Sequence, residues 1–145
     1  MTNAIKPTKI TIKKVESEWY NYFNTLNEIT RLREEITNPF DEEPDNNTGG
    51  GVNSVRNISD PTAKMATRLM TSKQLAYLTE IVEAIDQVYN ALPDNYKKLV
   101  RLKYWNKNNE LLWDGIALRL SVSKRQAQRW RNEIVQATLE VLGWR

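Results

Sequence analysis

The sequence predicts an all-α protein in which a long N-terminal helix and a helical bundle precede a C-terminal helix-turn-helix. Two observations support this fold class. Apolar residues recur every three or four positions through most of the chain, which is the period of an α-helix packed on one face. Helix-start and helix-stop residues such as Asn38-Pro39, Asp60-Pro61 and Gly143 stand between the periodic segments. The regions that these boundaries predict are 1–58, 59–92 and 93–145.

The composition narrows the function. The 145 residues are 40% hydrophobic and 27% charged, as in a soluble protein with a helical core. The chain has no cysteine and no histidine, so it lacks thiolate ligands and the commonest general base and zinc ligand. We therefore expect no enzyme, no metal and no cofactor. No run approaches the ~20 apolar residues of a membrane span, so we expect no contact with a membrane.

The net charge of +3 is unevenly distributed along the chain. Residues 1–60 carry 7 basic and 10 acidic side chains, whereas residues 93–145 carry 11 basic and 5 acidic ones. A basic region of this kind is the electrostatic footprint of a nucleic-acid-binding module. We therefore expect the C-terminal third to bind DNA and the acidic N-terminal part to do something else.

The first helix should run from about Thr11 to Thr37, where Asn38-Pro39 stops it. Seven of eight positions spaced alternately three and four residues apart are apolar, which is a heptad pattern. Two interpretations stay open: the helix pairs with a copy of itself in a homodimer, or it packs on later helices of its own chain. The eight positions are Ile12, Val15, Trp19, Tyr22, Leu26, Ile29, Arg33 and Ile36.

The segment 39–58 is acidic and then rich in asparagine and glycine, which predicts a solvated connection between helices. Its alternating acids do not form an EF-hand, because Asn46 holds the place of the required glycine and Val52 that of the bidentate glutamate.

The next helix should begin with Asp60 as N-cap and Pro61 in its first turn, with an interruption near Thr71-Ser72. Its second part carries an apolar stripe that suits packing on the first helix. The stripe comprises Leu75, Leu78, Val82, Ile85, Tyr89 and Leu92.

After Leu92-Pro93, a basic helix should span about Asn95 to Trp105 and bury its apolar residues. Its cations would contact DNA phosphates, although they equally suit a solvated surface. The residues expected inside are Leu99, Val100 and Leu102. The cations expected outside are Lys97, Lys98, Arg101 and Lys103.

A helix-turn-helix should span residues 109–143. Asn109 is the candidate N-cap of its first helix, which contains Gly115 at a cost of ~1 kcal/mol relative to Ala, and a close helix crossing would explain that glycine. The turn is Ser121-Val122-Ser123. The apolar residues of the first helix are Leu112, Trp113, Ile116, Ala117 and Leu120.

The second helix of this motif should run from about Lys124 to Leu142. Ser123 and Gln126 fit a capping box, while Val122 and Ala127 fit a hydrophobic staple. Gly143 suits the left-handed position after a helix, and Trp144 would fold back on Leu139. The expected buried stripe is Ala127, Trp130, Ile134, Ala137 and Val141.

The opposite face of this helix, in its N-terminal half, has side chains that read bases in the major groove. Arg pairs with guanine, Gln and Asn with adenine, and Lys with guanine or phosphate. A solvated helix face has a similar composition, so the capped turn and the basic C-terminal third favour the DNA interpretation. The candidate residues are Lys124, Arg125, Gln128, Arg129 and Asn132, with Ser123 beside them as cap and phosphate contact.

Part of the C-terminal third resembles the promoter-reading domain of bacterial sigma factors. The similar residues are Leu92-Pro93, Leu99 to Tyr104, Ile116-Ala117 and Ser121-Val122-Ser123. The turn in that domain usually has glycine where this chain has Ser121.

A wider set of features is similar to the RinA/ArpU family of phage transcriptional regulators. The features are the long N-terminal helix with its Pro-containing end, the Asn/Gly-rich loop at 46–51, Ser59-Asp60-Pro61-Thr62, Leu92-Pro93, Lys103-Tyr104, Trp113, Ile116-Ala117, Arg129-Trp130-Arg131 and Leu142-Gly143-Trp144. The resemblance implies an activator of phage late genes (packaging, morphogenesis and lysis) that acts on promoter DNA in the cytoplasm of a bacterial host, with host RNA polymerase as a further partner. The DNA-reading role carries over to Ser123, Lys124, Arg125, Gln128, Arg129 and Asn132.

Three other functions stay open at this point. The first is a sigma-like subunit that binds core RNA polymerase. The second is a DNA-packaging recognition subunit that forms a ring. The third is a helical adaptor whose basic face is only solvated. A nuclease is the least favoured function, because no histidine and no spaced set of carboxylates is present.

Overall fold

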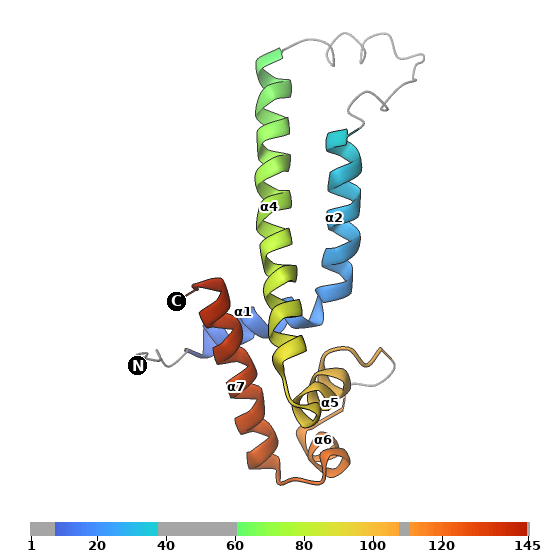
Figure 1. The fold of residues 1–145 in the computed structure, drawn as a ribbon, viewed down its shortest axis with the longest axis vertical. Coiled ribbons are helices and arrows are strands. Elements are labelled where there is room, and N and C mark those ends of the chain that lie inside the picture. Colours follow the sequence, from blue (N-terminus) through green and yellow to red (C-terminus); the bar gives the residue numbers. More distant parts are fainter. Residues whose placement is uncertain (1–7, 38–60, 108–110, 145) are drawn as a thin grey trace. The chain divides into compact units, whose positions relative to one another are not determined.

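The computed structural model describes residues 8–37, 61–107 and 111–144. All six elements in these ranges are α-helices, which confirms the all-α fold class (Figure 1). The chain divides into two compact units, which are described separately: unit 1 contains Met1–Phe23 and Glu80–Arg145, and unit 2 contains Asn24–Thr79.

The sequence predicts one continuous helix from about 11 to 37, but the structure has two helices there. Helix α1 spans Lys9–Tyr20 and helix α2 spans Tyr22–Thr37, with a break at Asn21. Asparagine and the aromatic residues around it have similar, modest helix propensities, so propensity alone does not explain the break. The flanking Trp19 and Tyr22 rings both pack on Trp105, at centroid distances of 5.9 and 5.2 Å, so tertiary contacts hold the chain on both sides of the break.

Helix α4 spans Pro61–Ala91 without the interruption predicted at Thr71-Ser72. The Thr71 hydroxyl donates a 2.9 Å hydrogen bond to the carbonyl of Thr67, so the polar side chain is satisfied inside the helix instead of competing with it. The predicted cap Asp60 and the loop at 39–58 lie outside the described residues.

Unit 1 also contains the three helices that follow α4 in the described residues. Helix α5 spans Asp94–Lys103, α6 spans Trp113–Leu120 and α7 spans Lys124–Leu142. The predicted N-cap Asn109 is wrong: the N-cap of α6 is Leu112, which makes no side-chain cap bond. Asn109 itself lies outside the described residues.

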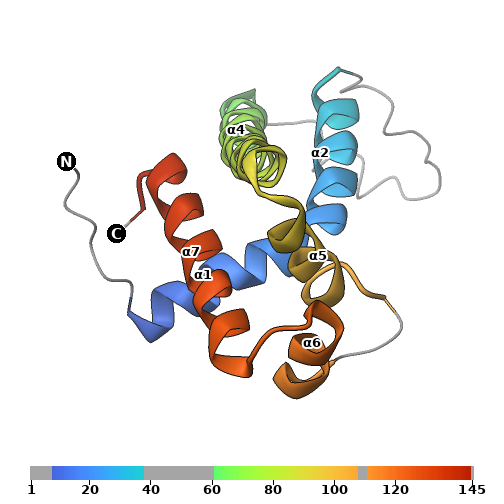
Figure 2. The same ribbon diagram turned by 60° about the horizontal axis from the view of Figure 1, so that its bottom comes forward.

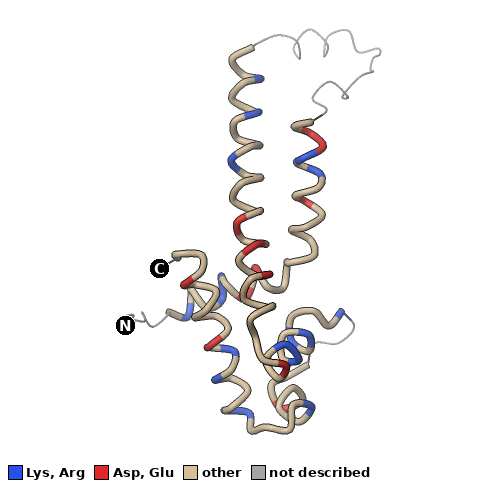
Figure 3. The backbone as a smooth tube through the Cα atoms, viewed as in Figure 1, with Lys and Arg blue, Asp and Glu red and all other residues tan. Residues whose placement is uncertain are grey.

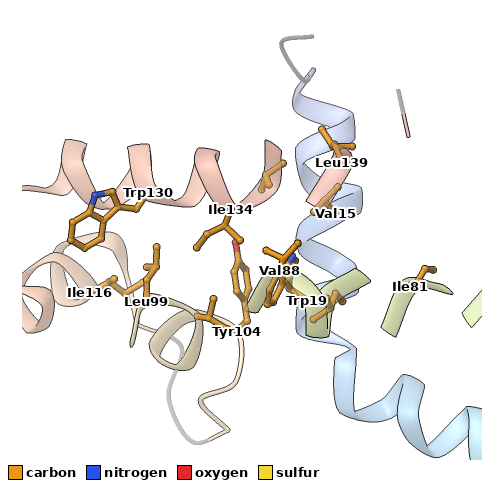
Figure 4. Packing of buried hydrophobic residues seen from close by; sticks show 13 residues of the cluster. Val15, Trp19, Ile81, Val88, Leu99, Tyr104, Ile116, Trp130, Ile134 and Leu139 are labelled. Atoms are coloured by element: carbon orange, nitrogen blue, oxygen red, sulfur yellow. The ribbon is translucent and has the colours of Figure 1, made fainter. Parts of the chain in front are cut away.

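The core of unit 1 joins α1, the C-terminal part of α4, α5, α6 and α7. In Figure 4, Trp130 and Ile134 of α7 face Leu99 and Ile116, while Val15 of α1 lies beside Leu139. Figure 2 shows α1 crossing α7, in agreement with the contacts between these two helices. The apolar face of α1 is therefore used within its own chain, which is the second of the two interpretations of the heptad pattern.

A buried hydrogen bond ties α1 to α7. The indole Nε1 of Trp19 donates to the hydroxyl of Thr138 at 3.1 Å, and that hydroxyl donates in turn to the carbonyl of Ile134 at 2.8 Å. Trp19 and Thr138 are both fully buried. Since an unpaired polar group here would carry a desolvation penalty, this bond selects one arrangement of α1 on α7.

Unit 2 contains most of α2 and the first part of α4. Thr25, Ile29 and Leu32 of α2 are buried. In α4, by contrast, Met65 and Leu69 are about 60% exposed. Within the described parts of the chain, no helix combines the length and apolar character needed to cross a membrane.

Candidate nucleic-acid interface

The junction of α6 and α7 is a tight turn with one unusual residue. Ser121 adopts the left-handed conformation, with φ 60° and ψ 40°, and ends α6. The amide of Ser121 donates to the carbonyl of Leu118, and that of Val122 donates to Ala117, both at 3.1 Å. A serine therefore takes the conformation for which glycine is the usual residue, at a cost of ~1–2 kcal/mol from its Cβ.

The start and end of α7 agree with the local sequence signals. The Ser123 hydroxyl accepts a 3.0 Å hydrogen bond from the amide of Gln126, which confirms the Ser123 half of the capping box. Val122 packs against the core and Ala127 is fully buried, as the staple predicts. At the other end Gly143 is left-handed, with φ 74°, and the amide of Trp144 donates to the carbonyl of Leu139 at 3.2 Å.

The buried stripe of α7 was predicted correctly only in its first half. Ala127, Trp130 and Ile134 are buried, but Val141 is 43% exposed and the expectation for it is wrong. The second half instead buries residues that the stripe omitted, namely Val135, Thr138 and Leu139. This shift of the buried face follows from α1, which packs on the C-terminal half of α7 from the side of Thr138.

The other face of α7 presents the predicted DNA-reading residues together. Arg125, Gln128, Arg129 and Asn132 are spaced i, i+3, i+4 and i+7, so they share one face in the N-terminal half of the helix. Gln128 is partly exposed and the other three are exposed, as are Ser123 and Lys124. Figure 3 shows that the basic positions of α7 lie in the half next to the turn and the acidic ones in the other half.

Lys124 approaches α6 but is not held there. Its Nζ lies 4.0 Å from the Asp114 carboxylate, and the side chains are 56% and 84% exposed. An exposed pair of this kind contributes little, roughly 0–1 kcal/mol, so it leaves Lys124 free to contact a phosphate or a base.

The cations of α5 divide into two groups. Lys98 and Arg101 are exposed, and the Arg101 guanidinium donates to the Tyr89 hydroxyl at 2.9 Å. Lys97 is half-buried, with its Nζ 5.5 Å from the centre of the Tyr89 ring. These three remain accessible candidates for phosphate contacts.

Lys103 is not the exposed cation that we expected. Its side chain is only 15% exposed and lies 3.9 Å from the Glu16 carboxylate. Its Nζ also donates to the Tyr20 hydroxyl at 3.0 Å and sits 4.8 Å from the centre of the Trp113 ring. An ammonium surrounded by aromatic rings and a carboxylate binds α5 to α1 and α6. Leu102, expected to be buried, is partly exposed.

A partly buried charge cluster around Arg131 was missed in the sequence. Glu16 of α1 accepts hydrogen bonds from Tyr104 at 2.6 Å and from Arg131 at 3.2 Å. Burial and the Glu16 carboxylate raise the pKa of Tyr104 well above its usual value. The sequence signal for this cluster was Glu16, a charged residue between the apolar positions Val15 and Trp19. Its partners could not be identified from the sequence, because they lie 88 and 115 residues away.

The glycine in α6 has no structural explanation in the part of the chain that the structure describes. A Cβ added to Gly115 would meet Leu111 Cδ2 at 3.5 Å, an ordinary contact, so the predicted close helix crossing is wrong. Among the described residues, no group of three or more carboxylates is placed to hold a metal ion.

Comparison with known proteins places these features in a family. The chain is 27% identical over 133 residues to a protein named Transcriptional activator rinA, from Staphylococcus phage phi11, and the match covers 92% of this chain and 91% of that protein. This similarity confirms the resemblance to the RinA regulators. No solved structure matches the chain at a significant level. A family model described as "Protein of unknown function (DUF722)" matches residues 12–140, from α1 into α7, and the chain therefore belongs to that family.

Proposed function

We propose that the protein is a phage-encoded, sequence-specific DNA-binding transcription regulator that activates late genes for packaging, morphogenesis and lysis. The observation that carries this proposal is the exposed face of α7, where Arg125, Gln128, Arg129 and Asn132 are aligned beside a capped helix start. The name of the similar protein, a transcriptional activator from a phage, supports the same function. The proposal includes no catalytic activity and places the protein in the cytoplasm of the bacterial host.

In this proposal α7 enters the major groove with its N-terminal half. Arg125, Gln128 and Arg129 contact base edges, because their side chains carry the donor and acceptor patterns that bases present there. Lys124 and Ser123 lie at the helix start, where a positive dipole end and free amides favour a phosphate.

A second group of contacts comes from α5. Lys97, Lys98 and Arg101 would bind phosphates and set the register of the protein on the duplex without reading its sequence. Each neutralised phosphate releases counterions, so this group contributes affinity that falls with salt.

The roles of the two groups are separable by substitution. Arg125→Ala should weaken binding to the preferred sequence more than binding to random DNA, by a factor on the order of ten, since base contacts carry discrimination. Lys98→Ala should weaken both equally and reduce the salt slope by about one. Lys73→Ala, which removes the same charge from α4, serves as the control and should change neither. Equal losses on both DNAs for Arg125→Ala would contradict its base-reading role.

We propose two protein partners beside DNA: host RNA polymerase and a second copy of this chain. The N-terminal helices offer less surface for a homodimer than the heptad pattern indicated, because Val15 and Trp19 are fully buried in their own chain. Among the apolar seam positions, the exposed Ile36 of α2 is the one left for such a contact. Light scattering of the full chain and of Ile36→Glu tests this: a dimer that becomes a monomer in the variant supports it, and a monomeric wild type refutes it.

A further inference from the structure

Asn132 differs from the other residues of the proposed DNA-reading face because its amide is already engaged. Its Oδ1 accepts a 2.7 Å hydrogen bond from Nε of Arg131. A guanidinium has only donors, so the atom that faces it must be the oxygen of the amide and not the nitrogen. The side chain of Asn132 is exposed, and its Nδ2 group is the part left to contact a ligand.

Arg131 is itself held in place by side chains of α1 and α6, and Tyr104 holds the carboxylate that it contacts. Its Nη1 donates to Oε2 of Glu16 at 3.2 Å, and the two side chains are 19% and 13% exposed. The same oxygen accepts from the hydroxyl of Tyr104, at the end of α5, at 2.6 Å. The guanidinium also lies 5.3 Å from the centre of the Trp113 ring of α6. Half-buried, charge-assisted contacts of this kind fix a side chain far better than an exposed pair does.

We propose that Glu16 and Arg131 are positioning residues for DNA reading, and that they make Asn132 a hydrogen-bond donor to an acceptor on a base edge. This inference rests on the proposed function. Asparagine pairs with adenine by accepting from N6 and donating to N7 at the same time. Because Oδ1 is oriented toward Arg131, Nδ2 is the group presented to a base, and this donor fits N7 of either purine, O6 of guanine or O4 of thymine, whereas cytosine offers no acceptor in the major groove.

The inference gives α1 a role in recognition without contact to DNA. Glu16 comes from the acidic N-terminal region, and it reaches the recognition helix through one arginine. The base preference at the Asn132 position therefore depends on Glu16, a residue 116 positions earlier in the chain.

The test uses the full chain and a library of double-stranded DNA with randomised sequence, from which bound molecules are sequenced. Asn132→Ala first identifies the base position that Asn132 reads. It is the position at which the variant no longer prefers any base. Arg131→Lys is the decisive variant, because it keeps the positive charge beside Glu16 but has no Nε–H for Oδ1. We expect the wild type to disfavour cytosine at that position by roughly tenfold, because cytosine has no acceptor in the major groove, and Arg131→Lys to lose most of this discrimination.

Controls separate positioning from a general loss of structure. Arg131→Lys should leave the affinity for random DNA and the salt slope unchanged, and it should leave the base positions lost in Arg125→Ala intact. Combined with Asn132→Ala, it should cause no further loss of discrimination. Glu16→Gln should weaken the same preference and no other, and circular dichroism melting verifies that each variant is folded.

The outcomes distinguish this inference from the function on which it rests. A wild type without any base preference overturns both. A wild type with base preferences that Arg131→Lys leaves unchanged overturns only the positioning role. A cytosine preference at the Asn132 position, or no change of any position in Asn132→Ala, overturns the assignment of Asn132 as a donor to an acceptor on a base edge.

Discussion

Trp19→Phe tests the packing of α1 on α7, the helix whose exposed face we propose to read DNA. Trp19 is fully buried, with its ring 6.0 Å from that of Tyr104, and its Nε1 donates to Thr138 at 3.1 Å. Phenylalanine keeps the six-membered ring but removes three heavy atoms and the donor. Emptying a buried Trp site completely costs ~3–5 kcal/mol, and one hydrogen bond contributes ~1 kcal/mol. We therefore expect Trp19→Phe to lower the free energy of unfolding by about 2–3 kcal/mol.

A double-mutant cycle isolates the hydrogen bond from the packing. Thr138→Val removes the acceptor at nearly constant volume, and the coupling between the two substitutions should be about 1 kcal/mol. Urea denaturation followed by circular dichroism measures all four proteins. Tyr77→Ala, at a position 44% exposed on α4, is the control and should cost less than about 0.5 kcal/mol. A coupling near zero, with Trp19→Phe no more costly than the control, would refute the docking of α1 on α7.

Four further predictions concern the turn, α6, α7 and pH. Ser121→Gly should raise stability by ~0.5–1 kcal/mol, because relief of the left-handed strain exceeds the entropy cost of glycine; a lower denaturation midpoint would contradict this. Gly115→Ala should raise it by a similar amount, ~0.5–1 kcal/mol, since its Cβ meets no close contact, and a thermal melt tests this. Trp130→Ala, at a buried site stacked on a tyrosine, should cost ~3–5 kcal/mol, and an unchanged melting temperature would place this residue outside the core. The raised pKa of Tyr104 means that the folded state keeps a proton which the unfolded chain loses near pH 10, so stability is full below that pH and falls above it, and Tyr104→Phe should flatten the fall in melts between pH 9 and 11.

Helix α7 shows which features a sequence can predict. Its bounds at Lys124 and Leu142 agree with expectation, because the signals are local: the Ser123 hydroxyl bonds the amide three residues later, and Gly143 takes a left-handed conformation. The exposed face of α7 was predictable for the same reason. Helical spacing alone aligns Arg125, Arg129 and their neighbours.

The sequence-based predictions are wrong where contacts with residues distant in the sequence determine the structure. The break at Asn21, the burial of Lys103 and the exposure of Val141 depend on which helix packs beside each residue, and periodicity does not specify that partner. The sequence-based expectation for Lys103 assigned a cation to the surface because cations usually lie there. Here a carboxylate from α1 and a ring of aromatic side chains stabilise it inside.

The proposal that α7 reads DNA has a consequence for affinity. A protein of this kind contacts phosphates through its cations and bases through its aligned polar face, so its affinity should fall with salt while its preference for one sequence persists. A basic face that is only solvated would give a weak, salt-sensitive attraction with no preferred sequence.

The most direct measurement is therefore a binding titration of the full chain on the DNA around its own gene, at two salt concentrations, with random-sequence competitor. Binding that resists competitor and weakens with salt is the result expected of a sequence-specific regulator. No binding at low salt, or binding that random DNA abolishes equally well, would contradict the account and favour a helical adaptor or a factor that needs RNA polymerase to reach DNA.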